Sequence, residues 1–408
     1  MDAASFAPPA VTGFDADRLG AIDAFIKTRY LDSGRLPHAQ LLIARDGRIV
    51  HFSHQGSARE NGAPVDETSI FRIASMTKPV TSIAFMQLVE EGTVALDTPV
   101  HHVLPELKGV GVYDGGGGGV PFVTRPTAAP MRMVDLLRHT SGLTYGFQNR
   151  GNIDAAYRAG KIENWHGNLD LDGFVAALGK LPLEFSPGEA WNYSVSTDVL
   201  GAVIERVSGM PLDRYFEERI FAPLGMADTG FMVPLEKIDR LTDCWTFVQG
   251  ARVMYDEGAK SAWSKRPTLL SGGGGLVSTA LDYHRFCTML LNGGTLEGAR
   301  IIGRKTLELM VQNHLPGNSD LSTLSRSLFS ETQNAGTGFG LGFAVNLDVA
   351  RSMIPGSVGE YYWGGMFSTA FFVDPVERIT MVFMTQLSPS GLYPIRRELK
   401  TMIYSALT

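Results

Sequence analysis

Ser75-Met76-Thr77-Lys78 is the stretch that decides the fold of this chain. On a helix, residues three apart share one face with their Cβ atoms about 5–6 Å apart, so Lys78 can lean over the Ser75 hydroxyl. A buried neutral amine in that position can accept the hydroxyl proton without help from a histidine. The stretch therefore indicates hydrolase chemistry in which Ser75 is the nucleophile and Lys78 the base.

The sequence around this pair predicts a buried helix that begins at Ser75. Pro79 falls in the first turn, where a missing N–H costs little because those donors lack partners within the helix. An apolar run, 80–89, then continues to Gly92, a typical stop. A helix that is apolar on most sides belongs in the core. The spacing alone also fits an ordinary N-cap serine, although Lys78 is the only lysine with a serine three residues before it.

A second element is Tyr193-Ser194-Val195, which follows the loop Ser186-Pro187-Gly188-Glu189. The helical pattern 200–207 comes next, so Tyr193 is predicted to lie in a loop just before a helix. A tyrosine beside a cationic lysine can have a lowered pKa and share the proton of the nucleophile. The other interpretation is a packed aromatic ring whose hydroxyl finds a backbone partner.

The third element is Trp363-Gly364-Gly365-Met366-Phe367-Ser368-Thr369, which runs into the strand-like Ala370-Phe371-Phe372-Val373. Paired glycines on an edge strand let a substrate carbonyl approach the backbone closely. A bulge or a tight bend is the alternative explanation of the same residues.

These three elements, in this order, resemble the serine β-lactamase and penicillin-binding-protein superfamily. Further matches are Leu136-Leu137-Arg138-His139-Thr140-Ser141-Gly142-Leu143, the stretch 272–279 and Gly338-Phe339-Gly340-Leu341-Gly342. The resemblance covers the chain from about residue 15 to the end. It implies an α+β fold, with an antiparallel sheet flanked by helices and a mostly helical inserted domain.

Within that superfamily the third element favours one branch. Class C β-lactamases and D-alanyl-peptidases usually carry Lys-Thr-Gly or His-Thr-Gly there, where the cation and hydroxyl hold the substrate carboxylate. Trp363-Gly364-Gly365 cannot offer this charge-assisted contact, and Val195 stands where class C enzymes carry an asparagine. Both departures favour a neutral, apolar ester. The chain is similar to the family VIII bacterial carboxylesterases, which share the class C fold.

The resemblance implies that short-chain carboxylic esters are hydrolysed through an acyl-enzyme on Ser75, with Lys78 and Tyr193 as one coupled base. Near neutral pH, that pair must give up a proton more easily than free side chains with pKa values of about 10. The backbone N–H groups of Ser75 and Met366 are the implied oxyanion hole. The expected substrate-binding residues are Trp363, Gly364, Gly365, Tyr145 and Phe367. No cofactor and no metal are expected.

Three other activities stay open. A β-lactamase or D-alanyl-peptidase would need another cation in place of the missing lysine of the third element. An acyltransferase would let an alcohol rather than water intercept the acyl-enzyme. A non-enzymatic sensor would become acylated and stay acylated.

Local signals predict how the chain is divided. The predicted elements are a helix over 15–30 capped by Asp15, a hairpin around Asp46-Gly47, a second hairpin over 369–385 and a closing helix over 393–406. If both hairpins join one sheet, residues 1–85 and 240–408 form an α/β domain. Residues 86–239 then form a mostly helical domain, and the active site lies between the two.

The middle of the chain contains four predicted helices, over 131–138, 171–178, 197–207 and 212–221. The glycine run 115–119 is interpreted as an irregular surface loop, and 272–275 as a tight turn into a buried segment. His139 is expected in a structural turn. Asp198 is expected to cap the helix that follows Tyr193, and orienting the active-site loop is the alternative.

Composition agrees with an ordinary globular protein. The 408 residues are 44% hydrophobic and 19% charged, enough for one or two closely packed domains. A net charge of −6 argues against a nucleic-acid partner. Neither a secretory signal nor an apolar span of about 18 residues is evident, so a cytoplasmic location is expected, or a periplasmic one if an export signal had been removed. Cys244 and Cys287 are expected to be ordinary thiols. The expected partner is a small ester, and the protein is expected to be a monomer or homodimer.

Overall fold

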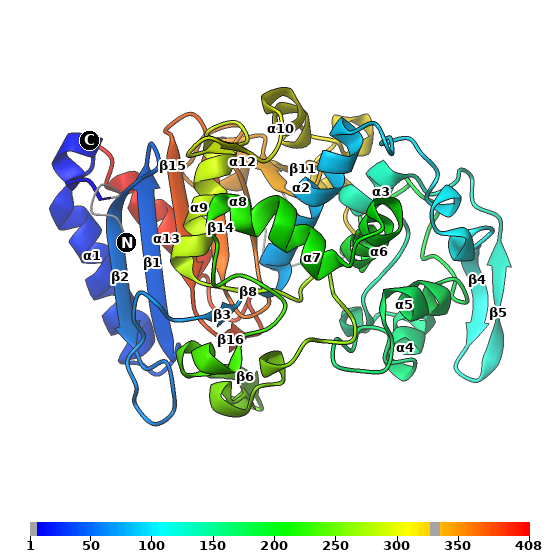
Figure 1. Cartoon of the computed structure of the whole chain (residues 1–408), viewed down its shortest axis with the longest axis horizontal. Coiled ribbons are helices and arrows are strands. Elements are labelled where there is room, and N and C mark those ends of the chain that lie inside the picture. Colours follow the sequence, from blue (N-terminus) through cyan, green and yellow to red (C-terminus); the bar gives the residue numbers. More distant parts are fainter. Residues whose placement is uncertain (1–5, 327–334) are drawn as a thin grey trace.

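A seven-stranded antiparallel sheet forms the centre of the computed structural model, which describes residues 6–326 and 335–408 (Figure 1). Its strand order is β11-β12-β13-β14-β15-β1-β2. The strands are β1 (His38–Arg45), β2 (Arg48–Gly56), β11 (Thr337–Phe339), β12 (Ala344–Asn346), β13 (Tyr361–Gly364), β14 (Ala370–Asp374) and β15 (Ile379–Met384). The N-terminal and C-terminal hairpins meet where β1 pairs with β15. The predicted α+β fold with an antiparallel sheet is confirmed.

The turn between β1 and β2 is the predicted Asp46-Gly47 turn. Both residues have positive φ, 53° and 76°, which is the backbone that a two-residue hairpin of this kind needs. Arg45 pairs with Arg48 on either side of it. The local sequence signal for this hairpin is therefore confirmed.

Each face of the sheet is covered by helices. In β1, Leu41 and Ile43 belong to the core layer on one face, and Leu42 and Ala44 belong to the layer on the other, as the period of two requires. The first face packs against α1 (Ala16–Ile26) and α13 (Ile395–Ser405), and the second against α9 (Ala280–Leu291) (Figure 1). The Asp15 carboxylate accepts a hydrogen bond of 3.1 Å from the Arg18 N–H, so the predicted cap of α1 is confirmed.

The predicted central helix is α2 (Thr77–Glu90), and its residues are almost all buried. The α-helix begins two residues later than expected, because Ala74–Met76 form a short 3-10 turn, η4, that contains Ser75. Ala74 opens this turn with a φ of 44°, an unusual value for a residue with a side chain. Pro79 lies in the first turn of α2 as predicted, and Gly92 follows the helix with a φ of 72°.

A largely helical region lies beside the sheet (Figure 1). Its helices are α3 (Met133–Leu137), α4 (Asn152–Ala159), α5 (Leu171–Leu178), α6 (Ser196–Ser208), α7 (Leu212–Phe216), the π-turn η8 (Glu217–Phe221) and α8 (Ala222–Leu224). The four helices predicted for the middle of the chain are all present. The last of them is divided, since α7 gives way to η8 before Phe221.

The remaining elements are short. Besides several short 3-10 and π turns, they include strands β3 (Phe71–Arg72), β6 (Cys244–Val248), β7 (Ala251–Asp256), β8 (Val277–Ser278), β9 (Thr295–Leu296), β10 (Ala299–Arg300) and β16 (Leu387–Ser388), and helices α10 (Arg304–Met310), α11 (Leu321–Leu324) and α12 (Val349–Ser352). Strand β3 pairs with β8 just before η4, which holds the segment leading to Ser75. Across 6–326 and 335–408, no helix is both long and apolar enough to pass through a bilayer.

The glycine run 115–119 differs from its prediction. Strands β4 (Val112–Gly117) and β5 (Val120–Arg125) form an antiparallel hairpin that includes Gly115–Gly117. The interpretation as an irregular loop is therefore wrong for these three glycines. The reason is that β5 supplies a partner strand, while the positive φ of Gly116 through Gly119 lets the chain turn back on itself.

Candidate active site

Ser75 and Lys78 lie together at the start of α2. The Lys78 ammonium Nζ is 3.2 Å from the Ser75 hydroxyl Oγ and donates a second hydrogen bond of 2.6 Å to the carbonyl oxygen of Gly273. Lys78 is only 2% exposed, whereas Ser75 is partly exposed. A substrate can therefore reach the hydroxyl while the amine stays inside the protein.

Two tyrosine rings flank the amine. The Lys78 Nζ lies 4.5 Å from the ring centroid of Tyr193 and 5.3 Å from that of Tyr145. Tyr193 comes from the loop just before α6, where the sequence placed it. The structure thus brings the hydroxyl of Ser75, the amine and both aromatic residues to one place, although they come from three separate parts of the chain.

Asp198 was expected to cap α6 and does not. Helix α6 begins at Ser196 without a side-chain cap, and the Asp198 carboxylate instead accepts hydrogen bonds from the Ser271 hydroxyl and, at 3.0 Å, from the Gly273 N–H. The capping prediction is wrong because Asp198 is already inside the helix and faces the 271–275 loop. Burial raises the pKa of this carboxyl, and the nearby Lys78 charge opposes that rise.

The glycine run 272–275 has a role that the sequence did not predict. Its Gly273 carbonyl holds the Lys78 amine, while its N–H is held by Asp198. A Cβ on Gly273 would lie 2.3 Å from an Asp198 carboxylate oxygen, so a side chain cannot be accommodated there. The only sequence signal was the run of glycines itself, which is typical of closely approaching backbone.

Glu163 is a second carboxyl near the site that the sequence did not indicate. It accepts a hydrogen bond from the Gly146 N–H, while Arg158 donates to the Gly146 carbonyl, so the residue after Tyr145 is held at both of its backbone polar groups. Burial raises the pKa of Glu163 to about 7, against the opposing effect of the Gly146 N–H and of the Arg158 and Lys78 charges.

The Trp363-Gly364-Gly365 segment reaches the same site. The Trp363 ring lies 5.5 Å from the Tyr193 ring, centroid to centroid, and is 2% exposed. Strand β13 is an inner strand of the sheet, so its description as an edge strand is wrong. Only Tyr361 and Tyr362 pair with β12, however, and the last two residues of β13 run past that pairing.

The two glycines of this segment make room for protein atoms. A Cβ on Gly364 would lie 2.6 Å from the guanidinium carbon of Arg396, and a Cβ on Gly365 would lie 2.5 Å from the Ile73 carbonyl oxygen. The sequence suggested that they make room for a substrate carbonyl. The structure adds a packing reason that the local sequence could not reveal, because Arg396 and Ile73 are distant in the chain.

Met366 and Phe367 follow directly and point in different ways. The Met366 side chain is 37% exposed, and no protein atom among the described residues accepts a hydrogen bond from its N–H. Phe367 is fully buried in a small core cluster with Ala74 and Cys244. Its ring lies 5.3 Å from that of Tyr255. The Met366 N–H is thus available to a ligand, while the buried Phe367 ring packs the segment against the core.

His139 is buried in a turn, with a φ of 58°. Its Nδ1 lies 3.3 Å from the Ser194 hydroxyl, and its ring packs 5.0 Å from that of Tyr193. Burial, followed by the Lys78 charge, lowers the pKa of His139 well below its usual value. The neutral ring supports the loop that carries Tyr193, in line with the expected structural turn.

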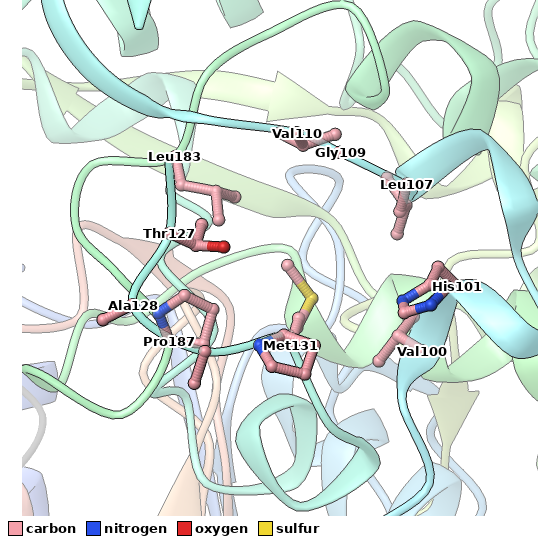
Figure 2. A pocket seen from close by; sticks show the side chains of 12 residues that line it. Val100, His101, Leu107, Gly109, Val110, Thr127, Ala128, Met131, Leu183 and Pro187 are labelled. Carbon is pink, nitrogen blue, oxygen red and sulfur yellow. The ribbon is translucent and has the colours of Figure 1, made fainter. Parts of the chain in front are cut away.

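A separate cavity of about 280 Å³ lies in the helical region (Figure 2). Figure 2 shows Met131 and Leu107 extending into it, with the His101 ring at one side and Thr127 and Leu183 at the other. Ser75, Lys78 and Tyr193 are not among its lining residues, so it is distinct from the site. Within 6–326 and 335–408, no three His, Cys, Asp or Glu side chains are grouped to hold a metal.

Comparisons with known proteins agree with this geometry. The family model described as Beta-lactamase matches residues 22–401. Protein Rv1367c of Mycobacterium tuberculosis is 34% identical over 88% of this chain and 88% of its own length. Esterase EstB of Burkholderia gladioli is 32% identical over 99% of this chain and all of its own length. The solved structure of EstCE1, a hydrolase with promiscuous acyltransferase activity, superposes with a TM-score of 0.79 at 26% identity, covering 95% of this chain and 99% of EstCE1.

Proposed function

Because this chain belongs to the β-lactamase family, we propose that it hydrolyses short-chain carboxylic esters through an acyl-enzyme on Ser75. It is a serine hydrolase, and the esterase branch agrees with its likeness to EstB and EstCE1. The observation that carries the proposal is the Lys78 amine, 3.2 Å from the Ser75 hydroxyl and beside the Tyr193 ring. This arrangement provides a nucleophile and a base without a histidine.

In the first step, the Ser75 oxygen attacks the ester carbonyl carbon and its proton passes to the coupled pair of Lys78 and Tyr193. The carbonyl oxygen becomes an oxyanion, which the N–H groups of Ser75 and Met366 stabilise. The carbon–oxygen bond to the alcohol then breaks, and the pair returns the proton to the leaving alcohol. Water repeats the sequence on the acyl-enzyme and releases the carboxylic acid and free Ser75.

The remaining assignments belong to the same proposal. Trp363 and Tyr145 contact the ester, and Gly364 and Gly365 shape the backbone that it approaches, whereas Phe367 acts from the core. The active site lies between an α/β domain, 1–85 and 240–408, and a helical domain, 86–239, with α2 crossing the boundary. The reaction needs no cofactor, its substrate partner is a small ester, and the protein is a monomer or homodimer. A cytoplasmic location stays a prediction.

A panel of p-nitrophenyl esters from acetate to palmitate tests the proposal on wild type and Ser75→Ala. Short chains should be turned over fastest, and Ser75→Ala should lose turnover on every ester. Nitrocefin is the matched comparison for a β-lactamase, since its carboxylate lacks a cation partner in the Trp-Gly-Gly element. A large preference for nitrocefin, or equal turnover by Ser75→Ala, would reject the proposal.

Acyl transfer is the second candidate. EstCE1 is described as having promiscuous acyltransferase activity, and the same acyl-enzyme could be intercepted by an alcohol in place of water. Product analysis with added alcohols distinguishes the two outcomes. An ester product that outweighs the free acid would assign the chain to acyl transfer.

A further inference from the structure

Arg396, in the first turn of α13, reaches the turn that carries Met366. Its Nη2 donates hydrogen bonds of 2.7 Å to the Gly365 carbonyl oxygen and 2.6 Å to the Thr369 carbonyl oxygen. The turn is also closed by the Gly365 N–H, which donates to the Thr369 carbonyl at 2.9 Å. One guanidinium nitrogen therefore joins both ends of the turn.

Gly364 makes this contact possible. The guanidinium carbon of Arg396 would lie 2.6 Å from a Cβ at position 364, which is well inside contact distance. Any side chain there would push Arg396 away from the two carbonyls. Gly364, the first glycine of the Trp-Gly-Gly element, is therefore needed to leave room for Arg396.

The Gly365 carbonyl and the Met366 N–H belong to the same peptide group. A cation that donates to the carbonyl oxygen draws electron density from the peptide, and so makes the N–H at its other end a stronger donor. Among residues 6–326 and 335–408, that N–H has no protein acceptor. Its strengthened donor capacity is available to a ligand oxygen.

The stability of α13 does not explain this arginine. Cations are unfavourable at the N-terminus of a helix, where the helix dipole is positive, and Arg396 lies in the first turn. Its hydrogen bonds to the two carbonyls of the turn are favourable and offset that cost.

We propose that Arg396 is a positioning residue that strengthens the oxyanion hole through the Gly365–Met366 peptide. This inference rests on the proposed function, because it takes the Met366 N–H as an oxyanion donor. The Arg396 cation beside the Trp-Gly-Gly element donates to two backbone carbonyls of the turn.

Arg396→Ala is the first test, with p-nitrophenyl butyrate as substrate. Losing a whole oxyanion donor lowers rates by roughly 10²–10³, so weakening one donor should lower kcat by about tenfold, with KM within about twofold. Guanidinium chloride, far below unfolding concentrations, should restore kcat in part, and equal urea should not. Arg397→Ala is the matched control, because Arg397 is an exposed neighbour that contacts only the Met353 carbonyl in the described contacts.

A second measurement distinguishes polarisation of the Gly365–Met366 peptide from a purely structural role of Arg396. A trifluoromethyl ketone forms an oxyanion when Ser75 adds to it, so its Ki should rise by the same factor as kcat falls. Arg396→Lys keeps the charge and should retain more kcat than Arg396→Gln, which keeps a neutral donor. This pair also carries the test if Arg396→Ala does not fold.

The outcomes are distinct from those that test the proposed function. Wild-type kcat in Arg396→Ala would overturn this inference, as would equal kcat in the Lys and Gln variants with no rescue by guanidinium. In either case, loss of turnover in Ser75→Ala would leave the proposed function standing. Full turnover by Ser75→Ala would overturn both.

Discussion

Two glycine runs, Gly115–Gly119 and Gly272–Gly275, look alike in the sequence but serve different purposes. In the first run, residues 116–119 have φ between 66° and 105°. A Cβ on residue 115, 118 or 119 would meet no atom within 4 Å, although one on Gly116 or Gly117 would lie 2.1 or 2.7 Å from another atom. In the second run, no residue has positive φ, and every added Cβ would lie less than 3.0 Å from another atom. The positive φ requires glycine at the hairpin, whereas glycine in the second run leaves space beside Lys78.

Of the three substitutions considered, Gly273→Ala should change the protein most, through its effect on kcat. The new methyl group would collide with the Asp198 carboxylate and displace the carbonyl that holds the Lys78 amine. Since small misplacements of catalytic groups can cost about 10² in rate, we expect kcat on p-nitrophenyl butyrate to fall by about 100-fold. Wild-type kcat in a folded Gly273→Ala protein would show that glycine is not required there to leave space.

Glu163→Gln should have the second largest effect, and the effect is on the free energy of unfolding. Glu163 belongs to the surroundings of the second glycine run, because its loop also packs Trp165 against Gly274. The folded pKa of Glu163, about 7, lies above its ordinary value of about 4.5. The native state therefore binds the proton more tightly, and the free energy of unfolding of the wild type falls as pH rises from about 4.5 through 7.

The Glu163→Gln variant keeps an acceptor for the Gly146 N–H but has no group that titrates at this position. Because Glu163 is partly exposed, the full shift is discounted, and the variant should gain about 1–2 kcal/mol relative to wild type between pH 5 and pH 8. Urea unfolding at the two pH values measures this difference. Glu106→Gln is the control, since a hydrogen bond from Arg206 lowers the pKa of Glu106, and the effect of this substitution should not change between pH 5 and pH 8. A Glu163→Gln difference that does not change with pH would contradict the prediction.

Gly118→Ala should have the smallest effect. Its φ of 66° makes an alanine cost about 1 kcal/mol in the free energy of unfolding, while nothing stands in the way of the methyl group. Activity should stay at the wild-type level, because the hairpin contributes no residue to the site. A clear loss of kcat would mean that the two glycine runs are less different than the structure indicates.

Features set by neighbouring residues could be predicted from the sequence, and those set by distant residues could not. The Asp46-Gly47 turn, the Asp15 cap and helix α5 depend on local backbone preference, and each appears as expected. The strand at 112–117 depends on β5 as its partner. The role of Asp198 depends on a loop more than seventy residues away.

The candidate site shows the same division. The pair Ser75 and Lys78 is three residues apart, so helix geometry alone indicated their contact. The place of Tyr193 beside them came from the family resemblance. Only the run of glycines pointed to the segment of the Gly273 carbonyl, and Glu163 and Arg396 gave no sequence signal, because each reaches the site through folding of the whole chain.

Covalent labelling with a fluorophosphonate, followed by mass spectrometry of the intact protein and its peptides, directly tests whether Ser75 is the nucleophile. We expect one label per chain, on the peptide that contains Ser75, with no label in Ser75→Ala and much slower labelling in Lys78→Ala. A label on another residue, or equal labelling of Ser75→Ala, would contradict this expectation.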